Sequence, residues 1–384
     1  MERRCIRLVM HRLFQNVHQC ATCASELLIF GLFHFQSRIG GIIMQDYHFE
    51  LEDTFLPFHD FLNYCRICFI NIIQRADQEQ LTKETINFKT AADASAYAKI
   101  CEEQGDIKEE WLIQHGYKET LYKVYYKHLF FSLLVDFSNY YNTSIDLAYH
   151  GNINVAWALL RKPFQETLAY IEWLYVDRNE LLTLMLTSDD TGSYEIVRKK
   201  DKIRKHIERI CPPNPSDPLD MYKFRYSYKD QLTLNGILQA TNHLITSRPA
   251  LKTSPSGLNF IFPDDEIRHR NIGFYYASIP YVLKYTLDLV VKMFGEIAEL
   301  SDYTMLINLT NSTLKSLQMI SEYADVKQLL HLDQINVFCP KCGHRHNSDE
   351  MWIQFAYDHF ECENCHNKIN TYQFLFDFNE ITEK

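Results

Sequence analysis

Four cysteines near the C-terminus form the pattern in this sequence that points most directly to chemistry. They occur as two pairs, Cys339 with Cys342 and Cys362 with Cys365, and two residues separate the members of each pair. Nineteen residues lie between the pairs. This spacing is typical of a tetrahedral zinc site with four thiolate ligands. Because four thiolates leave no coordination position for water or substrate, we expect one structural zinc ion rather than a catalytic one.

The residues around the cysteines predict how the zinc site is built. Gly343 follows the first pair, and glycine suits the tight turn that a metal-binding knuckle needs. Apolar side chains alternate over residues 351–357 and 372–378, which predicts two strands beside the cysteines.

A pair of β-hairpins that holds one zinc ion resembles the zinc-ribbon family, and the resemblance covers about residues 336–378. It implies that the ligands are Cys339, Cys342, Cys362 and Cys365. Four histidines also lie near the site, and with four thiolates present we expect them to be exposed or to contact the ligands. They are His344, His346, His359 and His366.

The charge of the C-terminal segment indicates which partner it meets. Residues 336–384 contain four Lys or Arg and eight Asp or Glu. Binding to phosphates depends on clustered cationic side chains, and this segment has no such cluster. We therefore expect the ribbon to contact protein, either this chain itself or a partner.

The composition of the whole chain narrows the function classes. Its 384 residues carry a formal net charge of −10, which disfavours nonspecific binding to nucleic acid or anionic membranes. No apolar run reaches the roughly 20 residues of a membrane-spanning helix. The zinc-type cysteine spacing favours reduced cysteines that bind metal, and therefore a location in the reducing cytoplasm, over a framework of disulfides.

Residues 1–43 differ from the rest of the chain because they contain five Arg and only two Asp or Glu. An Arg-rich leader is typical of an organelle transit segment. The alternative is a start site assigned too far upstream, with the natural protein beginning at Met44. We favour this second interpretation.

The periodicity of apolar residues is helical from Leu51 to about Leu330. We therefore expect a mainly α fold, with a multi-helix bundle over residues 44–330 and a small β zinc ribbon over residues 331–384. Pro163 falls within a helical stretch and should kink it.

The helix from Val155 to Val176 is apolar on most sides, which places it in the centre of a bundle. Arg161 and Glu166 are then charges in a largely dry setting and need partners. One interpretation is a polar pocket between helices, completed by Asp136, by His128 or by the run Arg268, His269 and Arg270. The other, which we favour, is a structural ion-pair network.

One segment has a basic face, because cations recur there at steps of four, three and four residues. They are Arg198, Lys202, Lys205 and Arg209. Such a stripe can grip the phosphates of nucleic acid. More often it is the solvated face of an amphipathic helix, and in this acidic chain we favour that interpretation.

Long helices around an Arg-containing apolar helix resemble the HEPN-type helical families of toxin and phage-defence systems. The resemblance implies RNA cleavage by an Arg-x4–6-His motif. Its matches in this sequence are Arg4 with His11 and Arg12 with His18, all within residues 1–43. The Arg268–Arg270 run has the right residue types at a different spacing, so no catalytic residue is assigned.

Together these patterns predict a cytoplasmic, mainly helical binding or regulatory protein with one structural Zn²⁺ and a ribbon that contacts protein. The second hypothesis is a nucleic-acid-directed effector, such as a HEPN-like ribonuclease. It would use the basic stripe for docking and the central charges in a pocket.

Overall fold

The computed structural model describes most of the chain after residue 48. The described residues are 49–104, 109–213, 220–227, 233–241, 245, 265–321, 323–334, 337–339, 341–346, 352, 354 and 359–370. The leader over 1–43 and the strand predicted over 372–378 lie outside them.

The described residues are mainly helical, as the periodicity predicts. The helices are α2 (Leu56–Gln78), α3 (Ala91–Gln104), α4 (Glu109–Gln114), α5 (Lys118–Tyr149), α6 (Ile153–Leu159), α7 (Leu168–Thr187), α8 (Lys200–Ile210), α9 (Met221–Tyr226), α10 (Leu234–Ala240), α11 (Asp265–Ile297), α12 (Asp302–Leu317) and α13 (Tyr323–Leu330). Short 3₁₀ turns are η1 (Asp53–Phe55), η3 (Thr191–Ser193), η4 (Ile196–Arg198) and η6 (Leu332–Gln334), and η2 (Pro163–Thr167) is a π turn. No described helix is both long enough and apolar enough to cross a membrane.

The chain divides into two compact units, and the smaller includes Thr82–Tyr125. There α3 and α4 enclose an aromatic cluster in which the rings of Tyr97 and Trp111 lie 5.3 Å apart. The Tyr117 hydroxyl donates to Asp93 Oδ2 at 2.8 Å. Ring contacts of this kind, together with this partly buried hydrogen bond, hold these short helices together.

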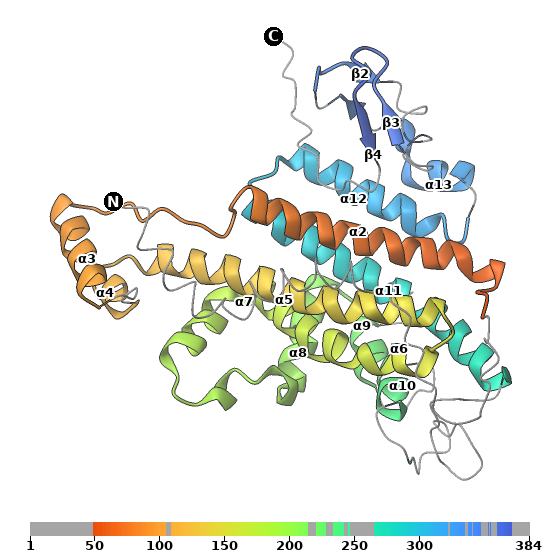
Figure 1. Ribbon diagram of the computed structural model, residues 1–384, viewed down its shortest axis with the longest axis horizontal. Coiled ribbons are helices and arrows are strands. Elements are labelled where there is room, and N and C mark those ends of the chain that lie inside the picture. Colours follow the sequence, from red (N-terminus) through yellow and green to blue (C-terminus); the bar gives the residue numbers. More distant parts are fainter. Residues whose placement is uncertain are drawn as a thin grey trace, which may run out of the picture. The chain divides into compact units, whose positions relative to one another are not determined.

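The larger unit contains Phe49–Leu81 and the chain from Tyr126 onward. Its central helix, α11, packs against α2, α12 and α6 (Figure 1). Large side chains fill the core between them, among them Trp157, Phe137 and Tyr275, all fully buried. Ser301 caps the start of α12 by accepting from the Thr304 N–H at 3.1 Å, which satisfies one of the unpaired donors of the first turn.

Pro163 breaks the regular helix, as its ring geometry predicts, but the break is a π turn rather than a simple kink. The N–H of Leu168 bonds the carbonyl of Pro163, five residues back. A π turn inserts one residue into the helix, so side chains after it face a different direction from that of a continuous helix.

The strands beside the cysteines form two antiparallel pairs. Strand β1 (Val337–Phe338) pairs with β2 (Arg345–His346), and β3 (His359–Glu361) pairs with β4 (Lys368–Asn370). In the register Val337 faces His346, and Phe360 faces Ile369. The strand predicted over 351–357 is wrong where it is described, because Trp352 and Gln354 have helical backbone.

Candidate functional site

The four predicted ligands come together in a metal-sized cluster. Their Sγ atoms all lie within 4.8 Å of one another. Cys339 Sγ is 3.6 Å from Cys365 Sγ, and Cys342 Sγ is 3.6 Å from Cys362 Sγ. Tetrahedral zinc with bonds of about 2.3 Å sets its sulfur ligands roughly 3.8 Å apart. The cluster therefore fits one tetrahedral metal ion with four thiolate ligands.

The two halves of the cluster have the same backbone construction. The N–H of Gly343 bonds the carbonyl of Cys339 at 2.8 Å, and the N–H of His366 bonds that of Cys362 at 2.8 Å. Both residues follow the second cysteine of their pair, and both have left-handed φ angles, 72° at Gly343 and 54° at His366. Each Cys-x-x-Cys segment therefore closes as one tight knuckle around the metal position.

The thiols differ in their surroundings. Burial raises the pKa of Cys339 to about 12, whereas the backbone N–H of His344 lowers the pKa of Cys342 to about 6. Cys339 and Cys362 are buried, and Cys342 is exposed. A bound Zn²⁺ would supply the positive charge that keeps all four as thiolates.

Of the four nearby histidines, the side chains of His344, His346 and His366 are described, and two of these three are exposed as expected. His344 and His366 are exposed, and His366 Nδ1 lies 3.3 Å from Glu361 Oε1. His346 is buried in β2, and its ring lies 4.9 Å from that of His344. The metal-sized cluster among the described residues contains the four cysteines and no histidine.

Gly343→Ala tests the knuckle geometry. An alanine in the left-handed region costs about 1–2 kcal/mol, which corresponds to roughly 5- to 30-fold weaker zinc binding when folding and binding are coupled. Competition with a chromophoric chelator measures this affinity. Gly343→Asn is the matched control, because asparagine tolerates the same φ; equal affinities for the Gly and Ala proteins would contradict the prediction.

The ribbon packs onto helices of the same larger unit. Val337, Cys339, Trp352 and Cys362 belong to one buried cluster together with helix residues. The helix residues are Ile307 and Leu314 of α12, Val326 of α13 and Leu332 of η6. At the edge, the Phe338 N–H donates to the Tyr303 hydroxyl at 3.3 Å. The cysteine cluster and the helices therefore share one apolar core, beside α12 and α13 in Figure 1.

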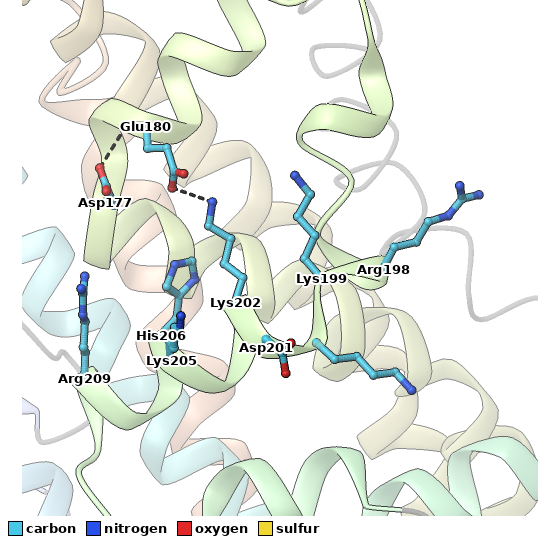
Figure 2. A pocket seen from close by; sticks show the side chains of 10 residues that line it. Asp177, Glu180, Arg198, Lys199, Asp201, Lys202, Lys205, His206 and Arg209 are labelled. Atoms are coloured by element: carbon cyan, nitrogen blue, oxygen red, sulfur yellow. Dashed lines mark hydrogen bonds and ion pairs between the residues drawn. The ribbon is translucent and has the colours of Figure 1, made fainter.

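The basic stripe lines a cavity of about 600 Å³ beside α8 (Figure 2). All four predicted residues line it: Arg198, Lys202, Lys205 and Arg209. Figure 2 shows Arg198 extending away from the others. The opposing face of α8 is apolar and buries Ile203 and Ile207, and α8 packs against α7 and α9. The amphipathic pattern is confirmed, while binding of nucleic acid stays a prediction.

One side of the cavity is formed by α7, where its helical geometry breaks. Asp177 has φ −152° and ψ 69°, and its Oδ1 accepts from the Glu180 N–H at 3.0 Å. Glu180 Oε2 then accepts from Lys202 Nζ at 2.6 Å and from Trp173 Nε1 at 3.0 Å. The ammonium of Lys202 lies 3.8 Å from the centre of the Trp173 ring, a cation–π distance.

His206 lines the same cavity and was not singled out by the sequence. It is only 4% exposed, and its Nδ1 has no hydrogen-bond partner among the described residues. Burial, reinforced by the charge of Lys202, lowers the pKa of His206 to about 4, so the imidazole is neutral at pH 7. His206 is next to Lys205 of the basic stripe in the sequence, but on α8 it lies beside the buried Ile203 and Ile207, which explains its burial.

The residues of the predicted polar pocket lie in varied surroundings. Arg161 and Glu166 are half-buried, and neither makes an ion pair or side-chain hydrogen bond within the described part of the chain. His269 is exposed, with its Nδ1 2.7 Å from Glu52 Oε1, and Arg268 is half-buried. A pocket shared by these four side chains stays a prediction.

Among the described residues, the buried acidic and basic side chains are instead Glu172 and Arg225, which are both fully enclosed and in direct contact. Arg225 also donates from Nε and Nη2 to the Phe164 carbonyl, at 3.1 and 2.6 Å. The Tyr226 hydroxyl donates to the Gln165 carbonyl at 3.0 Å. Both carbonyls belong to the π turn, so the ion pair holds the helix break in place.

Comparison with family models, with curated proteins and with solved structures found no match to this chain. The resemblance to HEPN-type families therefore stays a hypothesis. What carries a functional argument is the geometry of the cysteine cluster and of the cavity beside α8.

Proposed function

We propose that the chain is a helical binding or regulatory protein in which one structural zinc ion folds the C-terminal ribbon and the ribbon presents its knuckles to a protein partner. One observation carries this proposal: the cysteine cluster has a buried side and an exposed side. Cys339 and Cys362 belong to the core shared with α12, whereas Cys342 is exposed. One side of the ribbon is therefore buried in the shared core, and the other side is exposed to a partner.

The exposed side has a composition that suits protein contact. Lys341, Arg345, Glu363, Asn364 and His366 are all exposed there, and both signs of charge are present. Mixed charges without a cationic cluster favour complementary protein surfaces over phosphate backbones. Because the zinc site has no open position, the metal would serve folding rather than catalysis.

Charge exchange on the knuckles tests the partner contact. The zinc-loaded chain carrying Lys341→Glu with Glu363→Lys should lose a partner that the unchanged chain captures from cell extract, by about tenfold or more, since like charges across an interface are strongly unfavourable. The matched control is Lys292→Glu with Glu102→Lys, two exposed positions elsewhere. Zinc content is measured in all three proteins. An identical set of captured proteins would contradict the proposal.

A nucleic-acid-directed effector is the second candidate, and the cationic lining of the cavity beside α8 favours it. No catalytic group is assigned to it. Incubation with labelled single-stranded RNA and duplex DNA, at low and moderate salt, distinguishes the two candidates. Strand cleavage, or retention that weakens steeply with salt, would support the effector; intact and unretained nucleic acid would contradict it.

A further inference from the structure

The cavity beside α8 contains more positive charge than its own carboxylates neutralise. Six Lys or Arg side chains line it, against three Asp or Glu. Its volume of about 600 Å³ falls within the range of roughly 300–1,000 Å³ that is typical of small-molecule sites. An acidic chain that gathers cations around a ligand-sized hollow has the electrostatics of an anion site.

The cations that line the cavity differ in whether a carboxylate or an aromatic ring already holds them. Lys202 is held by Glu180 and by the Trp173 ring. Lys205 and Arg209, one turn apart on α8, make no ion pair with any described residue. These two cations lie on the face of α8 that lines the cavity, as Figure 2 shows. They are free to meet an anion from solution.

His206 supplies a second, independent observation. A buried polar atom without a partner costs about 1–3 kcal/mol, so such atoms are uncommon unless a ligand or water meets them. The unpartnered Nδ1 of His206 is such an atom, and the ring lines the cavity between Lys205 and Arg209 in sequence. The ring is neutral at pH 7 and can donate one N–H to an anionic oxygen.

A phosphate group matches these three side chains. It carries up to two negative charges and three acceptor oxygens, which suits one guanidinium, one ammonium and one imidazole N–H. The carboxylates of Asp177 and Glu180, on the α7 side, are acceptors for hydroxyl or amino groups. A nucleotide carries sugar hydroxyls and base amino groups at a distance from its phosphate, whereas inorganic phosphate has only the hydroxyl groups on its own phosphorus.

We propose that the cavity beside α8 binds the phosphate group of a nucleotide, either free or within a single strand, through Lys205, His206 and Arg209. The site is independent of the zinc ribbon and requires no strand cleavage. Lys202 and Glu180 form one wall of the site. Trp173 holds both of them, because its Nε1 donates to Glu180 and its ring contacts the Lys202 ammonium.

Calorimetric titration of the full zinc-loaded chain at pH 7 and low salt tests this site. The probes are inorganic phosphate, adenosine monophosphate and a short single-stranded RNA. Lys205→Glu with Arg209→Glu should weaken binding by at least about tenfold, because hydrogen bonds to charged groups are among the strongest. The control is Lys123→Glu with Lys292→Glu, which makes the same change in net charge at exposed positions. His206→Phe should weaken binding without any change in charge.

The outcomes separate the sources of the phosphate. Binding of the mononucleotide that is lost in the cavity variant and kept in the control supports a free nucleotide. Binding of the RNA alone, with the same dependence, supports a single strand. No binding of any probe overturns the proposal, and so does equal affinity in the two charge-reversed proteins. The ribbon is unchanged throughout, so none of these results bears on the knuckle contact.

Discussion

Cys362→Ser should reduce bound zinc from one ion per chain to none and unfold the ribbon. Cys362 is buried, its Sγ lies 3.6 Å from that of Cys342, and its backbone closes the second knuckle. Serine is a poor zinc ligand, and two-residue strands such as β1 and β2 have little stability of their own. Metal binding supplies about 10–16 kcal/mol of folding free energy in comparable zinc peptides.

Elemental analysis of the dialysed protein measures the zinc content, and limited proteolysis locates the unfolded segment. Cys211→Ser is the matched control, since Cys211 is exposed and lies outside the cysteine cluster. It should keep one zinc ion per chain. Retention of one zinc ion per chain in Cys362→Ser would contradict the assignment of the four ligands.

The core that the ribbon shares with α12 and α13 determines which helices are destabilised when the ribbon unfolds. Loss of the ribbon uncovers Ile307 and Leu314 of α12 and Val326 of α13. The short helix α13 depends on this contact, so its amides should lose protection in hydrogen exchange. The amides of α11 should keep it, because α11 is packed against α2 and α6 elsewhere. Equal loss of protection in both helices would show that the ribbon supports the whole unit.

The cluster of four cysteines was predictable because the sequence pattern that specifies it is local. The ligand pairs, their spacing and Gly343 all lie within short stretches of sequence, and chelation geometry dictates that spacing. The helical class was predictable for a similar reason, since burial on one face imposes a period of 3.6 residues. The strand predicted around Trp352 was wrong. Trp352 is buried against helices, and a tryptophan can be buried in this way whether its own backbone is helical or extended.

The buried ion pair was not predictable, and the π turn explains why. A continuous helix through Pro163 makes Arg161 and Glu166 appear central. The extra residue of the π turn changes which side chains face inward afterwards, and it is Glu172 that enters the core. Its partner, Arg225, is 53 residues away in sequence, and no periodicity links positions so far apart.

Glu172→Ala should destabilise the larger unit strongly, by about 3–5 kcal/mol. It leaves the Arg225 guanidinium buried without a counter-charge. It also removes the acceptor of the Tyr285 hydroxyl, which donates to Glu172 Oε1 at 2.8 Å. In a chain of this size, where 1 kcal/mol corresponds to roughly 1–2 °C, such a loss should lower the thermal midpoint by about 4–8 °C. Calorimetry or circular dichroism measures the midpoint.

The Arg66–Asp146 pair provides the control. Its atoms are 2.7 Å apart, but Asp146 is largely exposed, and exposed ion pairs contribute about 0–1 kcal/mol. Asp146→Ala should therefore lower the midpoint by no more than about 2 °C. If Glu172→Ala proves equally mild, water reaches Arg225 and the pair is not enclosed.

Removal of both charges separates the pair from the π turn. Glu172→Leu with Arg225→Met should recover much of the stability lost in Glu172→Ala, because buried pairs often stabilise little relative to apolar replacements. Recovery should be incomplete. The Phe164 carbonyl would lose both of its Arg225 donors, and an unsatisfied buried acceptor costs about 1–3 kcal/mol. Full recovery would mean that the π turn holds without Arg225, whereas the remaining deficit measures what its guanidinium contributes to the helix break.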